Sequence, residues 1–282
     1  MTNSSILPGP LFLIGCGNMA GAMLKGWLDA GADPAEITVI RPSGKPAGAG
    51  VRVLTALPED EVPAIVLIGV KPQKLDEVAP ALSPVLAPET ILVSILAGVE
   101  VAALRRRFAA PRTIVRAMPN TPVALRKGVV GLYGEGDDEH GAGARRTIER
   151  LMAALGHAEW FDDEALFALA GHLTAAAPAF LFRFLDALAE AGASLGLPED
   201  QARRLAIFMA EGASALAAAS DVAPTELARR VASPGGTTEA GLRILDAEEG
   251  LKPLLLRTLD ASRRRGIEMA EAARQVGAPK QA

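Results

Sequence analysis

The sequence has few of the residues that build disulfide frameworks and metal sites. It contains one cysteine, Cys16, and three histidines in 282 residues. A single cysteine excludes an intramolecular disulfide and a CxxC-type metal site, and the histidines lack the spacing of metal ligands. We therefore predict no metal centre, and we interpret Cys16 as a small apolar packing residue. One cysteine also suits the reducing environment of the cytoplasm.

The chain also lacks an excess of charge of one sign. Its 29 Lys and Arg residues against 33 Asp and Glu residues give a formal net charge of −4. This balance gives no electrostatic reason to expect nucleic acid or an anionic membrane as a partner. Residues 1–10 have no cationic segment before an apolar core, and Gly, Pro or charge interrupts the apolar runs before about 20 residues. We expect a cytoplasmic protein without a membrane segment.

What the sequence does contain is a regular alternation in its first half. Short β-branched runs alternate with helical patterns, and the runs are almost continuously apolar rather than strictly alternating. Such runs are typical of strands covered on both faces, as in a parallel sheet between helices. Residues 1–160 are therefore predicted to form an α/β Rossmann domain with a mostly parallel sheet. The predicted strands are residues 11–14, 37–40, 64–70, 91–96, 113–115 and 129–133.

The second half has a different pattern. Beyond residue 160 the β-branched runs vanish, and Ala- and Leu-rich helical segments follow at residues 179–192, 199–216 and 251–273. Several are apolar on more than one face, for example residues 206–210, so one small bundle cannot bury them. Residues 161–282 are predicted to form an all-α domain through which the chain forms a homodimer.

A glycine-rich segment follows the first predicted strand directly. Gly15-Cys16-Gly17-Asn18-Met19-Ala20 has the pattern G-x-G-x-x-A and leads into a helix predicted over residues 18–30, with Gly31 as its stop. The first glycine permits a tight turn, the second lets the backbone approach a pyrophosphate, and the alanine allows close helix–strand packing. Backbone N–H groups at the helix N-terminus then face the phosphates. The segment predicts a dinucleotide site, and a ligand-free turn is the alternative.

The residues after the second predicted strand indicate which dinucleotide is bound. NAD enzymes usually have Asp or Glu here to bind the ribose hydroxyls, whereas this strand is followed by Arg41-Pro42-Ser43. A guanidinium can bind a 2′-phosphate through two hydrogen bonds and stack on adenine, and the Ser43 hydroxyl can add a further bond. NADPH is the expected cofactor, with NADH as the second option. A solvated surface arginine is the alternative.

Three further segments fall just after predicted strands, where open α/β sheets bind their ligands. They are Val70-Lys71-Pro72, Ala97-Gly98 and Met118-Pro119-Asn120. The proline of the last segment and Pro122 stiffen the chain, so Asn120 is expected at a fixed place near the nicotinamide. A merely rigid turn is the alternative.

One segment of the helical half has the pattern of an anion site. Ser233-Pro234-Gly235-Gly236-Thr237-Thr238 precedes a helical pattern at residues 239–246. Adjacent glycines let successive backbone N–H groups converge on a small carboxylate, and Thr237 or Thr238 can cap the helix. By itself the pattern favours a simple helix-entry loop.

In combination, these segments resemble pyrroline-5-carboxylate reductase. The resemblance is ordered and spans nearly the whole chain. It implies an NAD(P)H-dependent enzyme that reduces the cyclic imine 1-pyrroline-5-carboxylate to L-proline, the last step of proline biosynthesis, as a homodimer interlocked through its helical domain and often assembled further. The matching segments are Gly15-Cys16-Gly17-Asn18-Met19-Ala20, Val70-Lys71-Pro72-Gln73, Ala97-Gly98, Arg116-Ala117-Met118-Pro119-Asn120-Thr121-Pro122 and Ser233-Pro234-Gly235-Gly236-Thr237-Thr238.

The resemblance also implies roles for the matched residues. The glycine segment would bind the pyrophosphate, and the loops at residues 70–72, 97–98 and 118–120 would line the nicotinamide. The substrate carboxylate would be bound by Ser233, Gly235, Gly236, Thr237 and Thr238. Of these, Thr238 would face the imine nitrogen and is the expected catalytic residue.

One family motif is altered. Where the family usually has Ser-Gly-Ser-Gly-Pro-Ala-Tyr, this chain has Thr174-Ala175-Ala176-Ala177-Pro178-Ala179-Phe180. Pro178 still suits the first turn of a helix, and Thr174 is expected to cap it. A helix is therefore expected here, whereas hydrogen bonds from this segment to the substrate are not.

The chemistry of an imine suits the residues available. Reducing a carbonyl usually requires a positioned acid, whereas a protonated imine is already electrophilic. No lysine occurs between Gly128 and Leu251, which argues against a 3-hydroxyacid dehydrogenase with a catalytic lysine there, although His172 is a possible substitute acid. The alternatives are a reductase of a related cyclic imine or of a 3-hydroxyacid-type substrate, and a nucleotide-binding relative without turnover.

Overall fold

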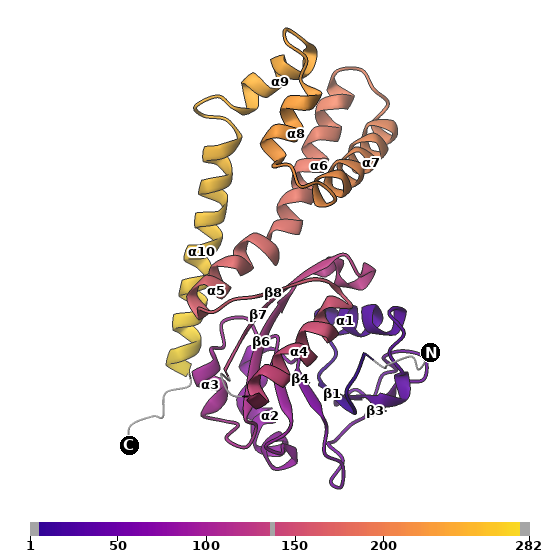
Figure 1. Cartoon of the computed structure of the whole chain (residues 1–282), viewed down its shortest axis with the longest axis vertical. Helices are drawn as coiled ribbons and strands as arrows, with labels where there is room; N and C mark the ends of the chain where they lie inside the picture. Colours follow the sequence, from indigo (N-terminus) through magenta and orange to yellow (C-terminus); the bar gives the residue numbers. More distant parts are fainter. Residues whose placement is uncertain (1–5, 136–138, 277–282) are drawn as a thin grey trace. The chain divides into compact units, whose positions relative to one another are not determined.

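An eight-stranded sheet forms the centre of the N-terminal part of the computed structural model, which describes residues 6–135 and 139–276 (Figure 1). The strand order is β3-β2-β1-β4-β5-β6-β7-β8, and β6–β7 is the antiparallel pair in an otherwise parallel sheet. The predicted Rossmann class is confirmed. The strands are β1 (Leu11–Ile14), β2 (Ile37–Ile40), β3 (Arg52–Leu54), β4 (Ile65–Ile68), β5 (Ile91–Ser94), β6 (Thr113–Pro119), β7 (Gly128–Gly134) and β8 (Gly156–Trp160).

All six predicted strands are present, whereas β3 and β8 were not predicted from the sequence. Both are the outermost strands of the sheet. β3 has only three residues, none of them buried, and β8 alternates between half-buried and exposed residues. Neither strand therefore has the continuous apolar run that identifies a strand covered on both faces.

The helices around the sheet bury alternate residues of each strand. Leu11 and Leu13 of β1 pack with α1 (Asn18–Asp29) and α4 (Glu139–Ala153), whereas Phe12 and Ile14 pack in a separate cluster. That second cluster includes apolar residues of α2 (Leu75–Leu82) and α3 (Val101–Arg105). Because both faces are covered, every residue of β1 is buried. Short 3-10 helices connect these elements, namely η1 (Pro34–Glu36), η2 (Pro72–Lys74), η3 (Ser83–Val85) and η4 (Thr121–Leu125).

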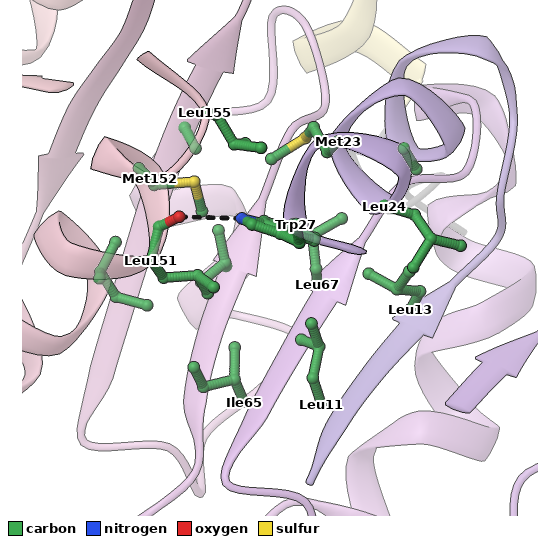
Figure 2. Packing of buried hydrophobic residues seen from close by; sticks show 14 of the residues in the cluster. Leu11, Leu13, Met23, Leu24, Trp27, Ile65, Leu67, Leu151, Met152 and Leu155 are labelled. Atoms are coloured by element: carbon green, nitrogen blue, oxygen red, sulfur yellow. Dashed lines mark hydrogen bonds between the residues drawn. The ribbon is translucent and has the colours of Figure 1, made fainter. Parts of the chain in front are cut away.

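Helix α1 is held against the sheet by the large side chain of Trp27 and by the absence of a side chain at Gly26. Trp27 is fully buried, and its Nε1 donates to the Leu151 backbone oxygen at 2.8 Å, as Figure 2 shows. A Cβ on Gly26 would stand 2.5 Å from the Val123 carbonyl oxygen, so the helix approaches η4 closely. The helix ends as predicted, with Gly31 at a φ of 91°.

The rest of the described chain is helical, which confirms the second half of the predicted fold class. The helices are α5 (Glu164–Thr174), α6 (Ala177–Ser194), α7 (Glu199–Ala218), α8 (Pro224–Val231), α9 (Thr237–Leu245) and α10 (Leu251–Val276). The chain divides into two compact units: unit 1 comprises Met1–Ala176 and Arg263–Ala282, and unit 2 comprises Ala177–Ser262. The change from strands to helices at residue 160 thus precedes the change of unit. Residues 1–5, part of the segment in which no export signal is predicted, lie outside the described residues.

Unit 2 buries few of its apolar side chains. Of residues 177–262, all of which the structure describes, the buried apolar ones are Ala189, Ala202 and Ala206, where α6 meets α7. Large apolar side chains on these helices are exposed, such as Phe182 and Phe208. An exposed apolar surface of this kind indicates a partner.

One described helical stretch, Glu164–Ser194, is long and apolar enough to cross a membrane by length and composition, although no such segment was expected from the sequence. The difference arises because an 18-residue window of this Ala- and Leu-rich stretch reaches a mean hydropathy of 1.7. It includes α5 and α6, and an exposed apolar surface is also what a subunit interface requires.

Candidate functional site

The carboxyl ends of four neighbouring strands are held at one edge of the sheet. Gly15 N–H donates to the Ile40 carbonyl at 2.8 Å, and Gly69 N–H donates to the Ile14 carbonyl at 2.9 Å. The N–H group after β5 bonds in the same way to the last residue of β4. The loops after β2, β1, β4 and β5 therefore begin side by side, at the edge where open α/β sheets bind ligands.

The glycine turn has the geometry that its sequence predicts. Gly15 has a φ of 83°, and a Cβ there would stand 2.9 Å from Val70 Cγ1, so both the conformation and the space require glycine. Around Gly17, by contrast, no atom of the described chain beyond its immediate neighbours in sequence lies within 4 Å of the position a Cβ would take. The fold itself leaves this space open, as the close approach of a phosphate requires.

The N-terminus of α1 adds hydrogen-bond donors to this turn. Gly17 is the N-cap and supplies no side chain to satisfy them. Within the described part of the chain, no acceptor is present for the backbone N–H groups of Asn18, Met19 and Ala20. Ala20 is buried, and a Cβ on Gly69 would stand 3.0 Å from its Cβ, so the predicted close packing of helix on strand is observed. The arrangement fits a pyrophosphate.

Cys16 lies half-buried between these glycines. Burial raises the pKa of its thiol, and the nearby Arg41 guanidinium opposes this effect more weakly. The thiol is therefore protonated at neutral pH, which is consistent with a packing role.

The loop after β2 folds around the Arg41 side chain. Nε donates to the Lys45 carbonyl oxygen at 2.8 Å, and Nη2 donates to the carbonyl oxygens of Lys45 and Pro46. Nη1 donates to the Cys16 carbonyl oxygen at 3.4 Å. The guanidinium thus joins this loop to the glycine turn, while the neighbouring Ser43 is exposed.

The loops after β4 and β5 border the same edge. Val70 is half-buried against Gly15, and Lys71 is exposed at the start of η2, which Pro72 opens. After β5, Ala97 is exposed and Gly98 turns the chain with a φ of 74°. The structure therefore brings these predicted residues to one edge together with the glycine turn.

Met118 and Asn120, at the end of β6, contact α5. The Asn120 amide donates to the Thr174 carbonyl at 3.1 Å and accepts from Val129 N–H at 2.9 Å. A Cβ on Gly171 would stand 1.9 Å from the Met118 sulfur, so this thioether packs directly on the helix. Asn120 is held at a fixed place, as expected, and the partners that hold it are protein groups.

A largely buried ion pair, which was not predicted from the sequence, lies next to this segment. Arg116 Nη1 donates to Glu164 Oε1 at 2.8 Å, and the same oxygen accepts from Val101 N–H at 2.9 Å. The guanidinium also lies 4.7 Å from the Phe167 ring centroid. Burial raises the pKa of the Tyr133 hydroxyl, and the negative charge of Glu164 raises it further. Residues distant in sequence meet here, so no local pattern reveals the pair.

The loop before α9 is exposed, and the residue that caps this helix differs from the one expected. Gly236 is the N-cap and Thr237 and Thr238 are the first two helical residues, so neither threonine caps the helix. Instead, Gly235 N–H donates to the Glu239 carboxylate at 2.7 Å. A carboxylate reaching back from the first turn makes a hydroxyl cap unnecessary.

The loop borders a hollow. Gly235 has a φ of 70°, and among the residues that the structure describes none except its sequence neighbours lies within 4 Å of the position its Cβ would take. Beside the loop is a hollow of about 320 Å³ in which two arginines and two carboxylates are present. Its lining residues are Arg229, Ala232, Pro234, Glu239, Leu242, Arg243 and Asp246.

In the altered segment at residues 174–180, the helix termini also differ from the expectation. Thr174 is the last residue of α5, and its hydroxyl donates to the Ala170 carbonyl at 3.0 Å. Thr174 was expected to cap α6. It does not, because α5 extends through this residue. Pro178 lies in the first turn of α6, as predicted. Within the described residues, no group of three or more His, Cys, Asp or Glu side chains could hold a metal ion.

Comparison with known proteins agrees with both halves of this description. Residues 11–98 match the family model described as NADP oxidoreductase coenzyme F420-dependent, and residues 164–269 match the one described as pyrroline-5-carboxylate reductase dimerisation. A pyrroline-5-carboxylate reductase of Pseudomonas aeruginosa is 38% identical over 264 residues, which cover 92% of this chain and 96% of that protein. The chain belongs to the pyrroline-5-carboxylate reductase family.

Other members of the pyrroline-5-carboxylate reductase family support this placement. The Pisum sativum protein is 32% identical over 92% of this chain and 96% of its own length. The structure of the Coxiella burnetii protein has a TM-score of 0.83 and 29% identity, and covers 92% of this chain and 98% of that one. A Plasmodium falciparum pyrroline carboxylate reductase solved with NADP bound shares the fold, with a TM-score of 0.78, 21% identity and coverage of 94% and 98%.

Proposed function

We propose that this protein reduces 1-pyrroline-5-carboxylate to L-proline with NADPH as the hydride donor, the last step of proline biosynthesis. The observation that carries the proposal is the match to a pyrroline-5-carboxylate reductase over 92% of the chain. The open glycine turn with its unpaired N–H groups supplies the cofactor site that this reaction requires. Bound NADPH would donate the hydride to the imine carbon.

The residues of unit 1 are assigned to cofactor binding. Gly15, Cys16, Gly17, Asn18, Met19 and Ala20 would hold the pyrophosphate, because donors and open space coincide there. Arg41 and Ser43 would lie beside the 2′-phosphate. The nicotinamide would be lined by the loops of Val70, Lys71 and Pro72, of Ala97 and Gly98, and of Met118, Pro119 and Asn120. NADH is the second cofactor.

The loop before α9 is assigned to the substrate. Ser233, Gly235, Gly236, Thr237 and Thr238 would bind the carboxylate, and Thr238 would be the catalytic residue that faces the imine nitrogen. The adjoining hollow presents side chains of both signs. Such a lining suits a substrate that carries both a carboxylate and a protonated imine.

The chain's residues need to supply little proton chemistry in this reaction. A protonated imine is already electrophilic, so anchoring the carboxylate and orienting the imine toward the cofactor provide most of the acceleration. The absence of lysine between Gly128 and Leu251 is compatible with this mechanism. His172 is half-buried. Its burial and, to a smaller extent, the positive charge of Arg263 lower its pKa, so the imidazole is mostly neutral at pH 7.

The proposed assembly is a cytoplasmic homodimer formed through the helical domain, and further association into a higher oligomer is compatible with it. The match of residues 164–269 to a dimerisation family and the exposed apolar side chains of unit 2 support this. By function, residues 1–160 are assigned to cofactor binding, and residues 161–282 to substrate binding and dimerisation. Neither nucleic acid nor membrane is a proposed partner.

The test measures consumption of NADPH with each of two imines, and formation of NADPH from NADP with a 3-hydroxyacid. 1-Pyrroline-5-carboxylate should be reduced fastest, its six-membered homologue more slowly, and a 3-hydroxyacid should not be oxidised with NADP. Faster reduction of the six-membered imine would assign a related substrate instead. Tight NADPH binding without turnover of either imine would favour the nucleotide-binding alternative.

A pair of glycine variants tests the cofactor site directly. Gly17→Val fills space that the fold leaves open, so it should abolish NADPH binding without unfolding the protein. Gly21→Ala lies four residues further along the same helix, where a Cβ is in ordinary contact, and should bind normally. Unchanged NADPH affinity in the valine variant would contradict the assignment.

A further inference from the structure

The turn after β2 contains two cations with different surroundings. Four contacts to backbone carbonyls hold the Arg41 guanidinium, two from Lys45 and one each from Pro46 and Cys16. The Lys45 ammonium is exposed, and within the described part of the chain it has no carboxylate partner. One cation is therefore part of the fold of the turn, and the other is free to meet a ligand.

The contacts of Arg41 limit what it can offer a phosphate. A guanidinium has five N–H hydrogens. The four contacts use the hydrogen on Nε, both hydrogens on Nη2 and one of the two on Nη1. One N–H remains, whereas two-bond recognition of a phosphate requires two parallel N–H groups. Arg41 could make the bidentate contact expected from the sequence only by releasing the carbonyls that shape the turn.

Lys45 has the properties that Arg41 lacks. Its backbone carbonyl is fixed by the guanidinium, so the base of its side chain is held beside Arg41. Its ammonium group has three donors at the end of a flexible stem. The Ser43 hydroxyl accepts from Lys45 N–H at 3.5 Å and retains its own proton for donation. No Asp or Glu occurs between Ile37 and Pro58 to oppose an anion here.

We infer that Lys45 determines the preference for NADPH over NADH by binding the 2′-phosphate, and that Arg41 acts mainly as a positioning residue that holds the turn and joins it to the glycine turn through Cys16. This inference rests on the proposed function. Because Arg41 bonds to the carbonyl of Cys16, inside the pyrophosphate turn, its loss should disturb the binding of every adenine dinucleotide. Loss of Lys45 should disturb only ligands with a 2′-phosphate.

The experiment measures binding of two inert fragments by titration calorimetry, adenosine 2′,5′-bisphosphate and adenosine 5′-monophosphate. Lys45→Gln should weaken the bisphosphate about tenfold, the size of one charge-assisted hydrogen bond, and change the monophosphate less than about twofold. Arg41→Gln should weaken both fragments by similar factors. Arg41→Lys keeps the charge without the four contacts, so it should behave like Arg41→Gln.

Lys25→Gln is the matched control. It removes the same charge from an exposed position further along α1, where the side chain pairs with Asp29, and should leave both affinities unchanged. Equal affinity of the Lys45 variant and the parent for the bisphosphate would overturn the inference. Selective loss of the bisphosphate in Arg41→Gln, rescued by Arg41→Lys, would also overturn it. If the parent protein bound neither fragment, the proposed cofactor site itself would be wrong.

Discussion

The two units of the chain bury their apolar side chains in opposite ways. Unit 1 has large side chains with no exposed surface on both faces of its sheet, such as Trp27 and Phe108. In unit 2 the buried apolar residues of the described helices are three alanines, and Phe208 keeps 68% of its surface exposed. Unit 1 therefore contains the core that stabilises its own fold, whereas the helices of unit 2 require another surface to cover them.

The units also differ in their ion pairs. In unit 1 the Arg116–Glu164 pair is largely buried, with side-chain exposures of 5% and 27%. The pairs described in unit 2, such as Arg203 with Glu199, lie between exposed side chains. Exposed pairs stabilise little, while breaking a buried pair leaves a charge without a partner. Stability in unit 1 should therefore depend on single residues, and stability in unit 2 on assembly.

The largest expected effect is in the core of unit 1. Phe108→Ala removes a fully buried ring and should lower the free energy of unfolding by about 4 kcal/mol. Denaturant unfolding should show the same loss at every protein concentration, since the residue packs within its own unit. A loss that varied with protein concentration would contradict the distinction between the units.

Breaking the buried ion pair should have the next largest effect. Glu164→Ala leaves the Arg116 guanidinium uncompensated and Val101 N–H without its acceptor, and should cost about 3 kcal/mol. Glu159→Ala removes an exposed partner of His157 and is the control, with an expected change below about 0.5 kcal/mol. Similar losses in both variants would show that the buried pair contributes no more than a surface one.

Phe208→Ala is the counterpart of Phe108→Ala in unit 2. The ring is exposed in the single chain, so its loss should leave the unfolding of the monomer unchanged and weaken self-association by about 2 kcal/mol if a second copy covers it. Analytical ultracentrifugation over a dilution series measures this difference. An unchanged dissociation constant would place Phe208 outside the interface.

Thr238→Ala separates the proposed substrate loop of unit 2 from the cofactor turn of unit 1. Loss of one hydrogen bond should lower kcat about tenfold, with NADPH affinity unchanged. Steady-state kinetics and a separate NADPH titration distinguish the two effects. Wild-type kinetics would remove Thr238 from the catalytic assignment.

The smallest expected effect is a pH dependence from His172. Burial lowers its folded-state pKa below the ordinary value of 6.5, so the unfolded chain takes up the proton first as the pH falls. Stability should be unaffected by this residue well above pH 6.5 and should decline as the pH falls from 6.5 toward the folded-state pKa. His172→Gln should remove that part of the decline in denaturant melts at pH 8 and pH 5.5.

Local sequence patterns identified most of the fold and part of the candidate site. The six apolar strands, helix α1 and the glycine turn each have a distinctive pattern within a short stretch of sequence, so they can be recognised without the structure. The edge strands β3 and β8 escaped because a strand with little buried surface has no distinctive apolar pattern. The threonines before α9 predicted a hydroxyl cap, whereas Gly236 is the cap and the Glu239 carboxylate accepts from Gly235 N–H.

A glycine turn between a buried strand and a helix could be predicted from the sequence, because Gly15, Gly17 and Ala20 directly follow an apolar run and directly precede a helical pattern. Tertiary structure alone decided how the long polar side chains are used. The Cys16 carbonyl that accepts from Arg41 and the Glu164 carboxylate that meets Arg116 come from distant segments of the chain. Such partners depend on how the strands are ordered, and no local spacing encodes that order.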